Sequence, residues 1–347
     1  MGRGARVEMS SDPATKPGGN LVERLNGPQL IMIIREFRRG DSVGMEALWQ
    51  SNGSEEFSLF GVNSAGIGKV LQRLERRRMR FLLGITRAVG RPVLAILVLE
   101  QEGKILGTVV LHFEPHAGVV SSLTVDQAVR RRGCAGELLK RCEDLGKRYR
   151  KSHLVLDVLA NNSPAVRLYE KFGFRTIRQI RWLAKDLAGG SEVAPVTGSF
   201  GLRPFRNSDA KPLTRLANEA MPEGLAMLVG QRPKDFLTSR LGRQLAQVER
   251  KSWVLEWDRC VLGYARATVS PVLQAAQLGP LVLGGDVEED PWEMLITEAS
   301  DWCSAKGLPR ATLSLPDHLD KCLPLLARLG WVEEFRVQTM ALGLHGT

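Results

Sequence analysis

The sequence has few of the residues that hold metal ions or build disulfide frameworks. Its 347 residues include five cysteines and five histidines. The cysteines are odd in number and never spaced as Cys-x-x-Cys, so neither a disulfide framework nor a zinc site is expected. The histidines form no HExxH or other ligand pair on a helix. We therefore expect no metal, and we interpret the cysteines as small buried hydrophobic residues; they are Cys134, Cys142, Cys260, Cys303 and Cys322.

Long apolar runs are also missing. The longest run covers residues 93–99, well short of the roughly 18 residues that a membrane helix needs. The opening Met-Gly-Arg-Gly-Ala-Arg is not followed by an apolar segment, so no secretory signal is expected. Hydrophobic residues make up 44% and charged residues 25% of the chain, as in globular proteins with ordinary cores. We expect a cytoplasmic protein with no membrane partner.

Charge is unevenly distributed along the chain. The net charge is +10, yet residues 1–190 carry 31 Lys and Arg against 19 Asp and Glu, which leaves the remainder slightly acidic. The basic half must therefore meet an anionic partner. Nucleic acid, an acidic protein surface and a phosphorylated small molecule all fit that requirement.

The pattern along the chain predicts a tail followed by an α/β domain. Residues 1–28 are rich in Gly, Pro, Ser and charge, which favours a flexible N-terminal tail. A first domain is expected over residues 29–188. Its strands are expected at 30–34, 93–99, 105–113, 119–125 and 154–159, with helices at 41–49, after Gly133, and after Ser163 as N-cap. In the helix after Gly133, Leu138, Leu139 and Cys142 share one apolar face.

A second unit repeats the first after a linker at residues 189–199. The repeated segments are 34–41 with 202–209, Leu106-Gly107 with Leu262-Gly263, Leu138-Leu139 with Leu295-Ile296, and Phe172-Gly173-Phe174 with Leu329-Gly330-Trp331. The last three pairs lie about 157 residues apart, and chance pairs would scatter. We therefore predict an internal duplication, with the second copy at residues 200–347.

The first copy contains a segment that is typical of a phosphate cradle. It lies between a strand and an amphipathic helix and reads Arg130-Arg131-Arg132-Gly133-Cys134-Ala135-Gly136. Small side chains let an anion approach backbone N–H groups at a helix N-terminus, where the helix dipole favours negative charge. The arginines supply counter-charge, although an arginine run is also typical of a solvated face or a nucleic-acid patch.

With a second segment, Asn161-Asn162-Ser163-Pro164-Ala165-Val166-Arg167-Leu168-Tyr169-Glu170-Lys171-Phe172-Gly173-Phe174, the cradle resembles the GNAT superfamily of acyl-CoA-dependent N-acetyltransferases. The cradle is similar to that family's Arg/Gln-x-x-Gly-x-Gly/Ala motif. The later segment is similar to its Asn-x-x-Ala-x-x-x-Tyr-x-x-x-Gly-Phe motif. The resemblance covers residues 30–187 well and 200–347 weakly. It implies a mixed, mostly antiparallel sheet flanked by helices, in two tandem GNAT-like domains.

The resemblance also implies a cofactor-binding site for acetyl-CoA as acyl donor. The 119–125 strand would splay from the 154–159 strand, and the pantetheine would lie in the gap against the backbone of Leu123, Thr124 and Val125. The N–H near Leu123 would face the thioester carbonyl and stabilise developing negative charge. The pyrophosphate would lie on the cradle at Arg130, Arg131, Arg132, Gly133, Cys134, Ala135 and Gly136.

The remaining site residues also follow from the resemblance. Tyr169 aligns with a general acid that protonates the departing thiolate, or is a core aromatic residue. Asn162 aligns with a coenzyme contact, or is a helix-start residue. A base is harder to find because the strand carries Ser121-Ser122 instead of a carboxylate. The candidates are Glu114, Asp157 and a water held by these serines.

The second copy departs from the motifs. Its cradle becomes Gly285-Asp286-Val287-Glu288-Glu289-Asp290-Pro291-Trp292, whose acids would repel coenzyme phosphates. Leu319 replaces Asn162 and Leu326 replaces Tyr169. We therefore predict a degenerate, non-catalytic copy that substitutes for a partner subunit and leaves a monomer with a pseudo-dimeric arrangement.

Three functions follow, and they differ in class. The first is an enzyme that transfers an acetyl group from acetyl-CoA to a primary amine of a small molecule or protein. The second is a non-catalytic acyl-CoA sensor. The third is a nucleic-acid-binding protein that uses the arginines at 73–80 and 130–132, which we disfavour because no aromatic stacking platform accompanies them. The acceptor groove would be built partly by residues 57–69, whose sequence specifies no particular amine.

Overall fold

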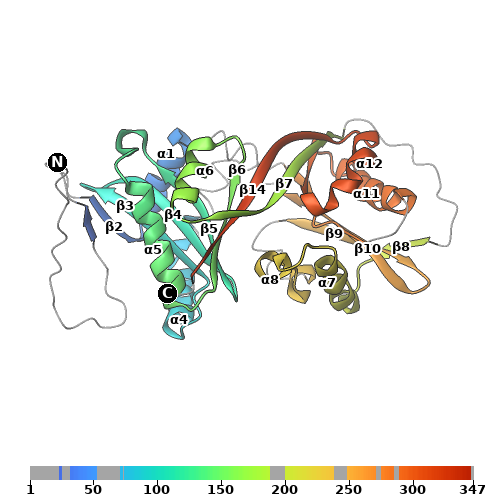
Figure 1. The fold of residues 1–347 in the computed structure, drawn as a ribbon, viewed down its shortest axis with the longest axis horizontal. Helices are drawn as coiled ribbons and strands as arrows, with labels where there is room; N and C mark the ends of the chain where they lie inside the picture. The colour runs from blue at the N-terminus through green and yellow to red at the C-terminus, as the bar shows by residue number, and fades with distance from the viewer. Residues whose placement is uncertain are drawn as a thin grey trace.

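The computed structural model describes residues 23–25, 32–52, 71–72, 74–187, 200–237, 248–270, 275–284 and 289–344. The linker at 189–199, the groove segment at 57–69 and most of the acidic loop at 285–288 therefore lie outside the described residues, as does most of the tail at 1–28. Within that tail, β1 (Glu23–Leu25) pairs with β2. Two lobes lie side by side and share one continuous sheet (Figure 1).

The first lobe forms the strands and helices that the sequence predicts, together with a helix at Arg77–Ala88 and a strand at Arg175–Asp186 that it does not predict. Its strands are β2 (Met32–Glu36), β3 (Leu94–Gln101), β4 (Lys104–Phe113), β5 (Ala117–Val125), β6 (His153–Leu159) and β7 (Arg175–Asp186), and its helices are α1 (Asp41–Asn52), α4 (Arg77–Ala88), α5 (Cys134–Arg148) and α6 (Ser163–Lys171), with a 3-10 turn η1 (Gln127–Val129). Strands β2 to β5 form an antiparallel meander, and β5 runs parallel to β6.

Helices cover both faces of the first-lobe sheet. Leu138, Leu139 and Cys142 of α5 are fully buried against one face, which confirms the predicted helix face. Met45 and Trp49 of α1 are buried against the opposite face. Burial of each large apolar side chain contributes about 1.5–3 kcal/mol, so these two contacts fix the layer order around the strands.

Two sequence predictions need correction. Asn162, not Ser163, is the N-cap of α6, because its side chain accepts a hydrogen bond from the Ala165 backbone N–H at 3.2 Å. Cys260 is exposed, whereas the other four cysteines are buried as predicted. It is the first residue of β10 and follows the tight turn after β9, where a side chain faces solvent.

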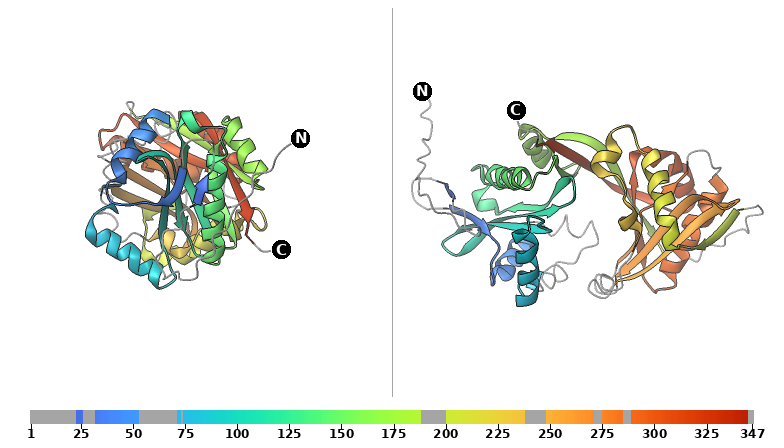
Figure 2. Two further views of the ribbon diagram at one scale, coloured as in Figure 1. Left: turned by 90° about the vertical axis from the view of Figure 1, so that its left-hand side faces the viewer. Right: turned by 90° about the horizontal axis from the view of Figure 1, so that it is seen from below.

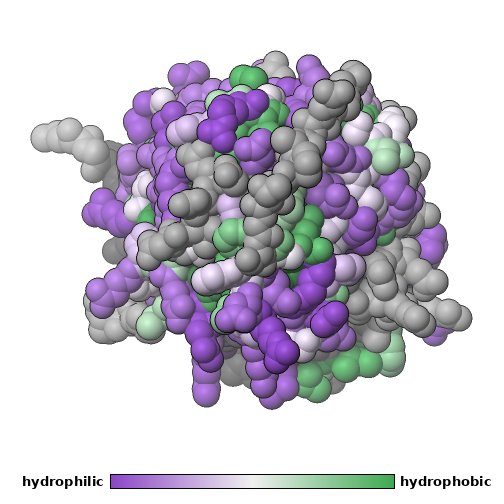
Figure 3. All heavy atoms as spheres, turned by 90° about the vertical axis from the view of Figure 1, so that its right-hand side faces the viewer, coloured by the Kyte–Doolittle hydropathy of each residue, from purple (hydrophilic) through white to green (hydrophobic). Residues whose placement is uncertain are grey.

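The second lobe repeats the element order of the first. Its elements are β8 (Phe200–Pro204), η2 (Asn207–Asp209), α7 (Ala210–Glu219), α8 (Leu225–Val229), α9 (Pro233–Phe236), β9 (Glu249–Trp257), β10 (Cys260–Ser270), β11 (Ala275–Leu278), β12 (Val282–Leu283), α11 (Glu289–Ser304), β13 (Arg310–Pro316), η3 (Asp317–Cys322), α12 (Leu323–Arg328) and β14 (Val332–Gly343). Strand β11 runs parallel to β13, as β5 does to β6. The outer end of this lobe is mostly hydrophilic, with apolar side chains gathered in limited areas (Figure 3).

The two lobes exchange one strand each. Strand β14 lies between β6 and β7, and β7 pairs in turn with β13 of the second lobe. Both strands are long enough to bridge the lobes, as Figure 1 and the right panel of Figure 2 show. The first-lobe sheet is therefore completed by the last strand of the second lobe.

A buried ion-pair network recurs in both lobes. In the first, Arg35 donates to both carboxylate oxygens of Asp41 at 2.7 and 2.9 Å and also pairs with Glu100. The second-lobe counterparts are Arg203, Asp209 and Glu256, with distances of 2.8 and 3.0 Å to Asp209 and 2.7 Å to Glu256. In both lobes the network ties the strand before the first helix to the next strand of the meander. The predicted repeat therefore has a structural counterpart in side-chain contacts.

Candidate active site

Strands β5 and β6 separate in the middle of the first lobe. Their parallel pairing extends from Ala117 with His153 to Val120 with Leu156 and then stops. Beyond that point β5 continues to Val125, but it pairs only with β4 on its other side. The backbone groups of β5 that face β6 therefore lack a strand partner over this stretch. A gap of this kind can accept an extended ligand as a pseudo-strand.

A β-bulge lies where the two strands separate. Ser122 and Leu123 together stand opposite Val109, and Ser122 has a positive φ of 52°. The bulge resets the side-chain alternation, so that Val120 and Leu123 contact the same core although they are three residues apart. Bulges are common beside active sites because they redirect backbone and side chains.

A buried hydrogen-bond chain supports the bulge. Trp49 of α1 donates from Nε1 to the Thr108 hydroxyl at 2.9 Å, and that hydroxyl donates to the Ser122 carbonyl at 3.4 Å. Trp49 is 4% and Thr108 is 0% exposed. Sequence reasoning missed both residues, because a tryptophan or a threonine within an apolar helix or strand looks like an ordinary core residue.

The register of β5 shows which backbone groups face the gap. The Asp126 N–H bonds to the Leu106 carbonyl of β4 at 2.8 Å. Antiparallel pairs alternate, so Thr124 also faces β4, while Val125 and the Leu123 carbonyl face the gap. The Leu123 N–H lies inside the bulge, where the alternation is interrupted. The Arg130 side chain donates to the Val125 carbonyl at 3.1 Å, which agrees with this orientation.

The cradle segment forms an open helix N-terminus. Arg131 and Gly133 both have left-handed backbone conformations, with φ of 62° and 82°. Helix α5 begins at Cys134, and the Glu137 N–H is the first to bond within the helix, to the Gly133 carbonyl. The preceding N–H groups therefore point outward. A Cβ atom added to Gly133 or Gly136 would meet no atom within 4 Å, so a ligand can approach the backbone there.

The loop before α5 is held in place from both ends. Asn52, the last residue of α1, accepts hydrogen bonds from the Gln127 N–H at 3.2 Å and from Arg130 at 3.3 Å. Asp126 accepts from the Ala128 N–H at 2.9 Å. The Arg130 guanidinium is thus engaged with its own loop, while Arg131 and Arg132 are exposed beside the helix start. Sequence reasoning did not identify Asn52.

Tyr169 lies on α6, and Asn162 is the N-cap of that helix. Tyr169 is 8% exposed and belongs to the first-lobe core, where its ring meets Phe174 edge to face at 5.9 Å. Asn162 caps the helix through its side-chain oxygen. Each residue therefore has a structural function, which coexists with any contact to a ligand.

The two candidate carboxylates occupy different places. Asp157 directly follows the last β5–β6 pair and accepts a hydrogen bond from Thr339 of β14 at 2.6 Å. Arg178 of β7 donates to the same Thr339 hydroxyl at 3.1 Å. Asp157 thus lies where the strands separate.

Glu114 lies in the turn before β5, and the strand from Ala117 to Leu123 spans about 20 Å. Glu114 pairs with Arg232 of the second lobe at 2.7 Å and with Lys234 at 3.6 Å. Burial raises the pKa of Glu114, but the hydrogen bond and charge of Arg232 outweigh this, with help from Lys234, and hold the pKa below its ordinary value. The structure does not bring Glu114 together with Leu123 and Tyr169.

Residues 69–174 match the model of the Acetyltransferase (GNAT) family. This segment contains the splay, the bulge, the cradle and α6, so the chain carries a GNAT-family domain and the resemblance is confirmed. One curated relative is the N-terminal acetyltransferase B complex catalytic subunit NAA20 of Arabidopsis thaliana. It is 35% identical over 79 residues, which is 22% of this chain and 45% of that protein. The matched part thus spans less than half of the relative's length.

Solved structures agree with the fold over both lobes. A GCN5-related N-acetyltransferase from Sphaerobacter thermophilus has a TM-score of 0.64 at 14% identity, covering 91% of this chain and 96% of that one. A tandem GNAT protein from the clavulanic acid biosynthesis pathway has a TM-score of 0.56 at 16% identity, and the match covers 73% of this chain and 84% of that one. A putative acetyltransferase from Pyrococcus horikoshii has a TM-score of 0.58 at 16% identity, and the match covers 92% of this chain and 92% of that one. The predicted fold class, a mostly antiparallel sheet flanked by helices in tandem GNAT-like units, is therefore confirmed.

Among the described residues, no helix is long and apolar enough to cross a membrane.

Proposed function

We propose that the first lobe transfers an acetyl group from acetyl-CoA to a primary amine. The observation that carries this proposal is the splay of β5 from β6 directly beside the open N-terminus of α5. The gap offers unpaired backbone groups for the amides of a pantetheine arm. The helix start offers N–H groups and nearby arginines for a pyrophosphate.

The proposal assigns specific tasks to the candidate site residues of this lobe. Leu123 and Val125 hold the donor by backbone hydrogen bonds, and the Leu123 N–H stabilises negative charge that develops on the carbonyl oxygen under attack. Residues 131–136 bind the diphosphate. Tyr169 protonates the departing thiolate. Asp157, alone or through water, accepts a proton from the amine, since it lies where the strands separate.

The acceptor is a primary amine of undefined identity. The name of the Arabidopsis relative, an N-terminal acetyltransferase, makes a peptide α-amine one class to test, next to small amines and protein lysines. The exchange of β7 and β14 supports a monomer, because the second lobe already completes the sheet that a partner subunit would otherwise extend.

The test measures acetyl-CoA binding by calorimetry and thiol release over a panel of amines. Gly136→Leu is the key variant: its side chain has room in the fold but would cover the helix start. We expect binding to weaken at least tenfold. The matched control is Gly84→Leu on α4, which is also helical and also has open space around its Cβ position.

Equal binding by both variants would contradict the cradle assignment. Binding of acetyl-CoA without turnover on any amine would instead support the alternative function, an acyl-CoA sensor.

A further inference from the structure

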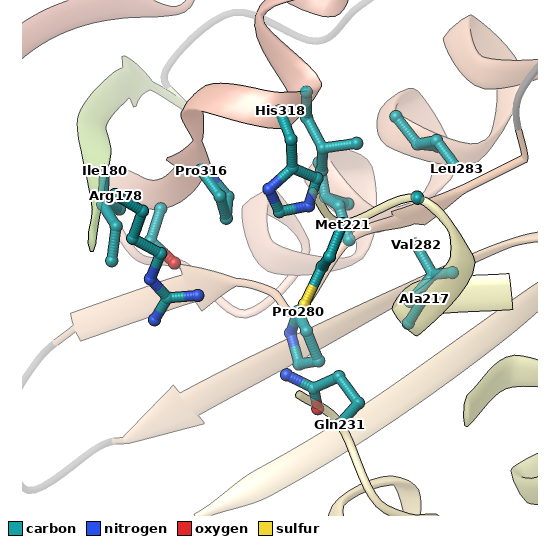
Figure 4. A pocket seen from close by; sticks show the side chains of 14 residues that line it. Arg178, Ile180, Ala217, Met221, Gln231, Pro280, Val282, Leu283, Pro316 and His318 are labelled. Carbon is teal, nitrogen blue, oxygen red and sulfur yellow. The ribbon is translucent and has the colours of Figure 1, made fainter. Parts of the chain in front are cut away.

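A cavity of about 150 Å³ lies in the second lobe. Its wall is formed by β7, the end of α7, the segment at β12, the end of β13 and η3 (Figure 4). It opens beyond the last pair of β11 with β13, Leu278 with Leu313, so it occupies the second-lobe counterpart of the β5–β6 gap. A cavity of this volume admits a molecule about the size of benzene.

Four polar side chains line the cavity, Ser314 among them, and the other three approach it from different sides. In Figure 4, Arg178 comes from one side, with His318 and Gln231 on two others. The Arg178 Nε bonds to Thr339, but no hydrogen bond or ion pair engages its two terminal nitrogens among the described residues. The Nδ1 of His318 is buried with no hydrogen-bond partner in the same part of the chain.

Gln231 is presented by a fixed backbone. Its N–H donates to the Asn218 side chain at 2.8 Å, and its carbonyl accepts from the same side chain at 3.0 Å. The backbone position is thus set by α7, and the side-chain amide is directed to the cavity. Buried polar groups in proteins normally have partners, so the unpartnered Nδ1 of His318, which lines the cavity together with the half-buried Arg178 and Gln231, indicates a ligand.

The electrostatics of the cavity favour an anion. Burial lowers the pKa of Arg178 even though the charges of Asp157 and Asp317 raise it; at the described positions neither carboxylate lies within 4.0 Å of the guanidinium. Burial also lowers the pKa of His318, against Asp317, so the imidazole is neutral at pH 7 and can donate or accept a hydrogen bond. The cavity therefore holds one cation that no protein carboxylate neutralises directly.

The opposite wall is apolar. Met221, Val282 and Leu283 line it across from Arg178 (Figure 4). A guanidinium binds a carboxylate through two parallel hydrogen bonds, and an apolar wall accepts a ring or a branched chain. A coenzyme would exceed the volume of the cavity.

We propose that this cavity binds a small organic monocarboxylate. Its carboxylate lies on the terminal nitrogens of Arg178, with Gln231 and His318 as further hydrogen-bond partners, and its apolar body lies against Met221, Val282 and Leu283. The cavity is then a second ligand-binding site, formed mainly by the second lobe with Arg178 supplied by β7 of the first.

The test titrates the full chain, without acetyl-CoA, with benzoate and with its neutral analogue benzamide, followed by ligand-observed NMR and calorimetry. We expect saturable benzoate binding and at least tenfold weaker benzamide binding. Arg178→Gln should weaken benzoate binding at least tenfold. Arg175→Gln, an exposed position on the same strand, should leave it unchanged.

A second variant addresses the fold, since Arg178→Gln also removes the bond to Thr339. Ala220→Phe at the cavity wall places a ring in the cavity while keeping Arg178, and it should abolish benzoate binding in a protein whose melting temperature remains close to that of the parent. Absence of benzoate binding, equal affinity for benzamide, or unchanged affinity in Arg178→Gln would each overturn the proposal. Because no readout involves acetyl-CoA, failure here leaves the proposed acetyl transfer standing.

Discussion

The indole of Trp49 and the hydroxyl of Thr108 are 2.9 Å apart in the first-lobe core, and the same hydroxyl reaches the Ser122 carbonyl at the β5 bulge. Thr108→Val keeps the shape but removes the hydroxyl that contacts both the indole and the carbonyl. We expect the free energy of unfolding to fall by about 1–3 kcal/mol and acetyl-CoA affinity to fall severalfold. Chemical denaturation and calorimetry measure the two effects.

Thr312→Val is the matched control for this prediction. Its hydroxyl bonds to the Ala276 carbonyl of a neighbouring strand in the second lobe at 3.3 Å. It should lower stability without changing acetyl-CoA affinity. If both variants bound acetyl-CoA like the parent, the bulge would not depend on this hydrogen-bond chain.

Tyr169 gives a kinetic prediction. Tyr169→Phe removes the hydroxyl and keeps the ring contact with Phe174. If the hydroxyl protonates the leaving thiolate, kcat should fall about 100-fold while KM for acetyl-CoA stays within a factor of two or three. The control is Tyr149→Phe, whose ring contacts Phe113 at the far end of α5. Similar kcat values for the two variants would remove Tyr169 from the mechanism.

Glu114 predicts a pH-dependent contact between the lobes. Its pKa is lower in the folded protein than in the unfolded chain, so the stabilisation is present above the ordinary carboxyl pKa and is lost as the pH falls through the folded value. Glu114→Gln should lower stability at pH 7 by at most about 1 kcal/mol, because the pair is partly exposed. The difference from the parent should vanish in acid.

Denaturant unfolding of both proteins between pH 8 and pH 3 measures this difference. Glu170→Gln, at an exposed position on α6, should show no such trend. A difference that stayed constant down to pH 3 would show that the Arg232 pair does not stabilise the fold.

The burial of the cysteines predicts how many thiols react rapidly in the native protein. Cys260 is exposed, whereas the other four are buried, and burial raises the pKa of Cys142 and Cys303 to about 12. A thiol reagent at pH 8 should therefore modify one group rapidly in the native protein and all five after unfolding. In Cys260→Ser the rapid phase should disappear. Rapid reaction of two or more thiols would contradict the packing of α5 or α11.

The sequence predicts the local elements well because their signals are local. The apolar face of α5 follows from the spacing of Leu138, Leu139 and Cys142, and the cradle follows from glycines at a helix start. The gap beside β5 was an implication of the family motifs, and the register now supplies its backbone geometry. The helix face and the cradle each depend on residues close together in the chain.

Features that depend on distant residues could not be predicted in this way. The alternation of apolar and polar residues in β14 is compatible with pairing at any open strand edge. It therefore does not indicate whether β6 or β13 is a neighbour of β14. In the sequence, nothing distinguishes Asn52, Thr339 and Arg178 from other polar residues. Only the fold brings them next to their hydrogen-bond partners. The same holds for Glu114, a candidate base whose ion pairs with Arg232 and Lys234 of the second lobe appear only in the fold.

The position of β14 has a consequence for how the protein is made. The first lobe is translated early, yet its sheet stays open between β6 and β7 until the ribosome has released almost the whole described chain. During that interval two unpaired strand edges are exposed, which is a hazard for association with other nascent chains. A frameshift near residue 332 would for the same reason damage the amino-terminal half, and deletion of the second lobe would do so even if that lobe bound nothing.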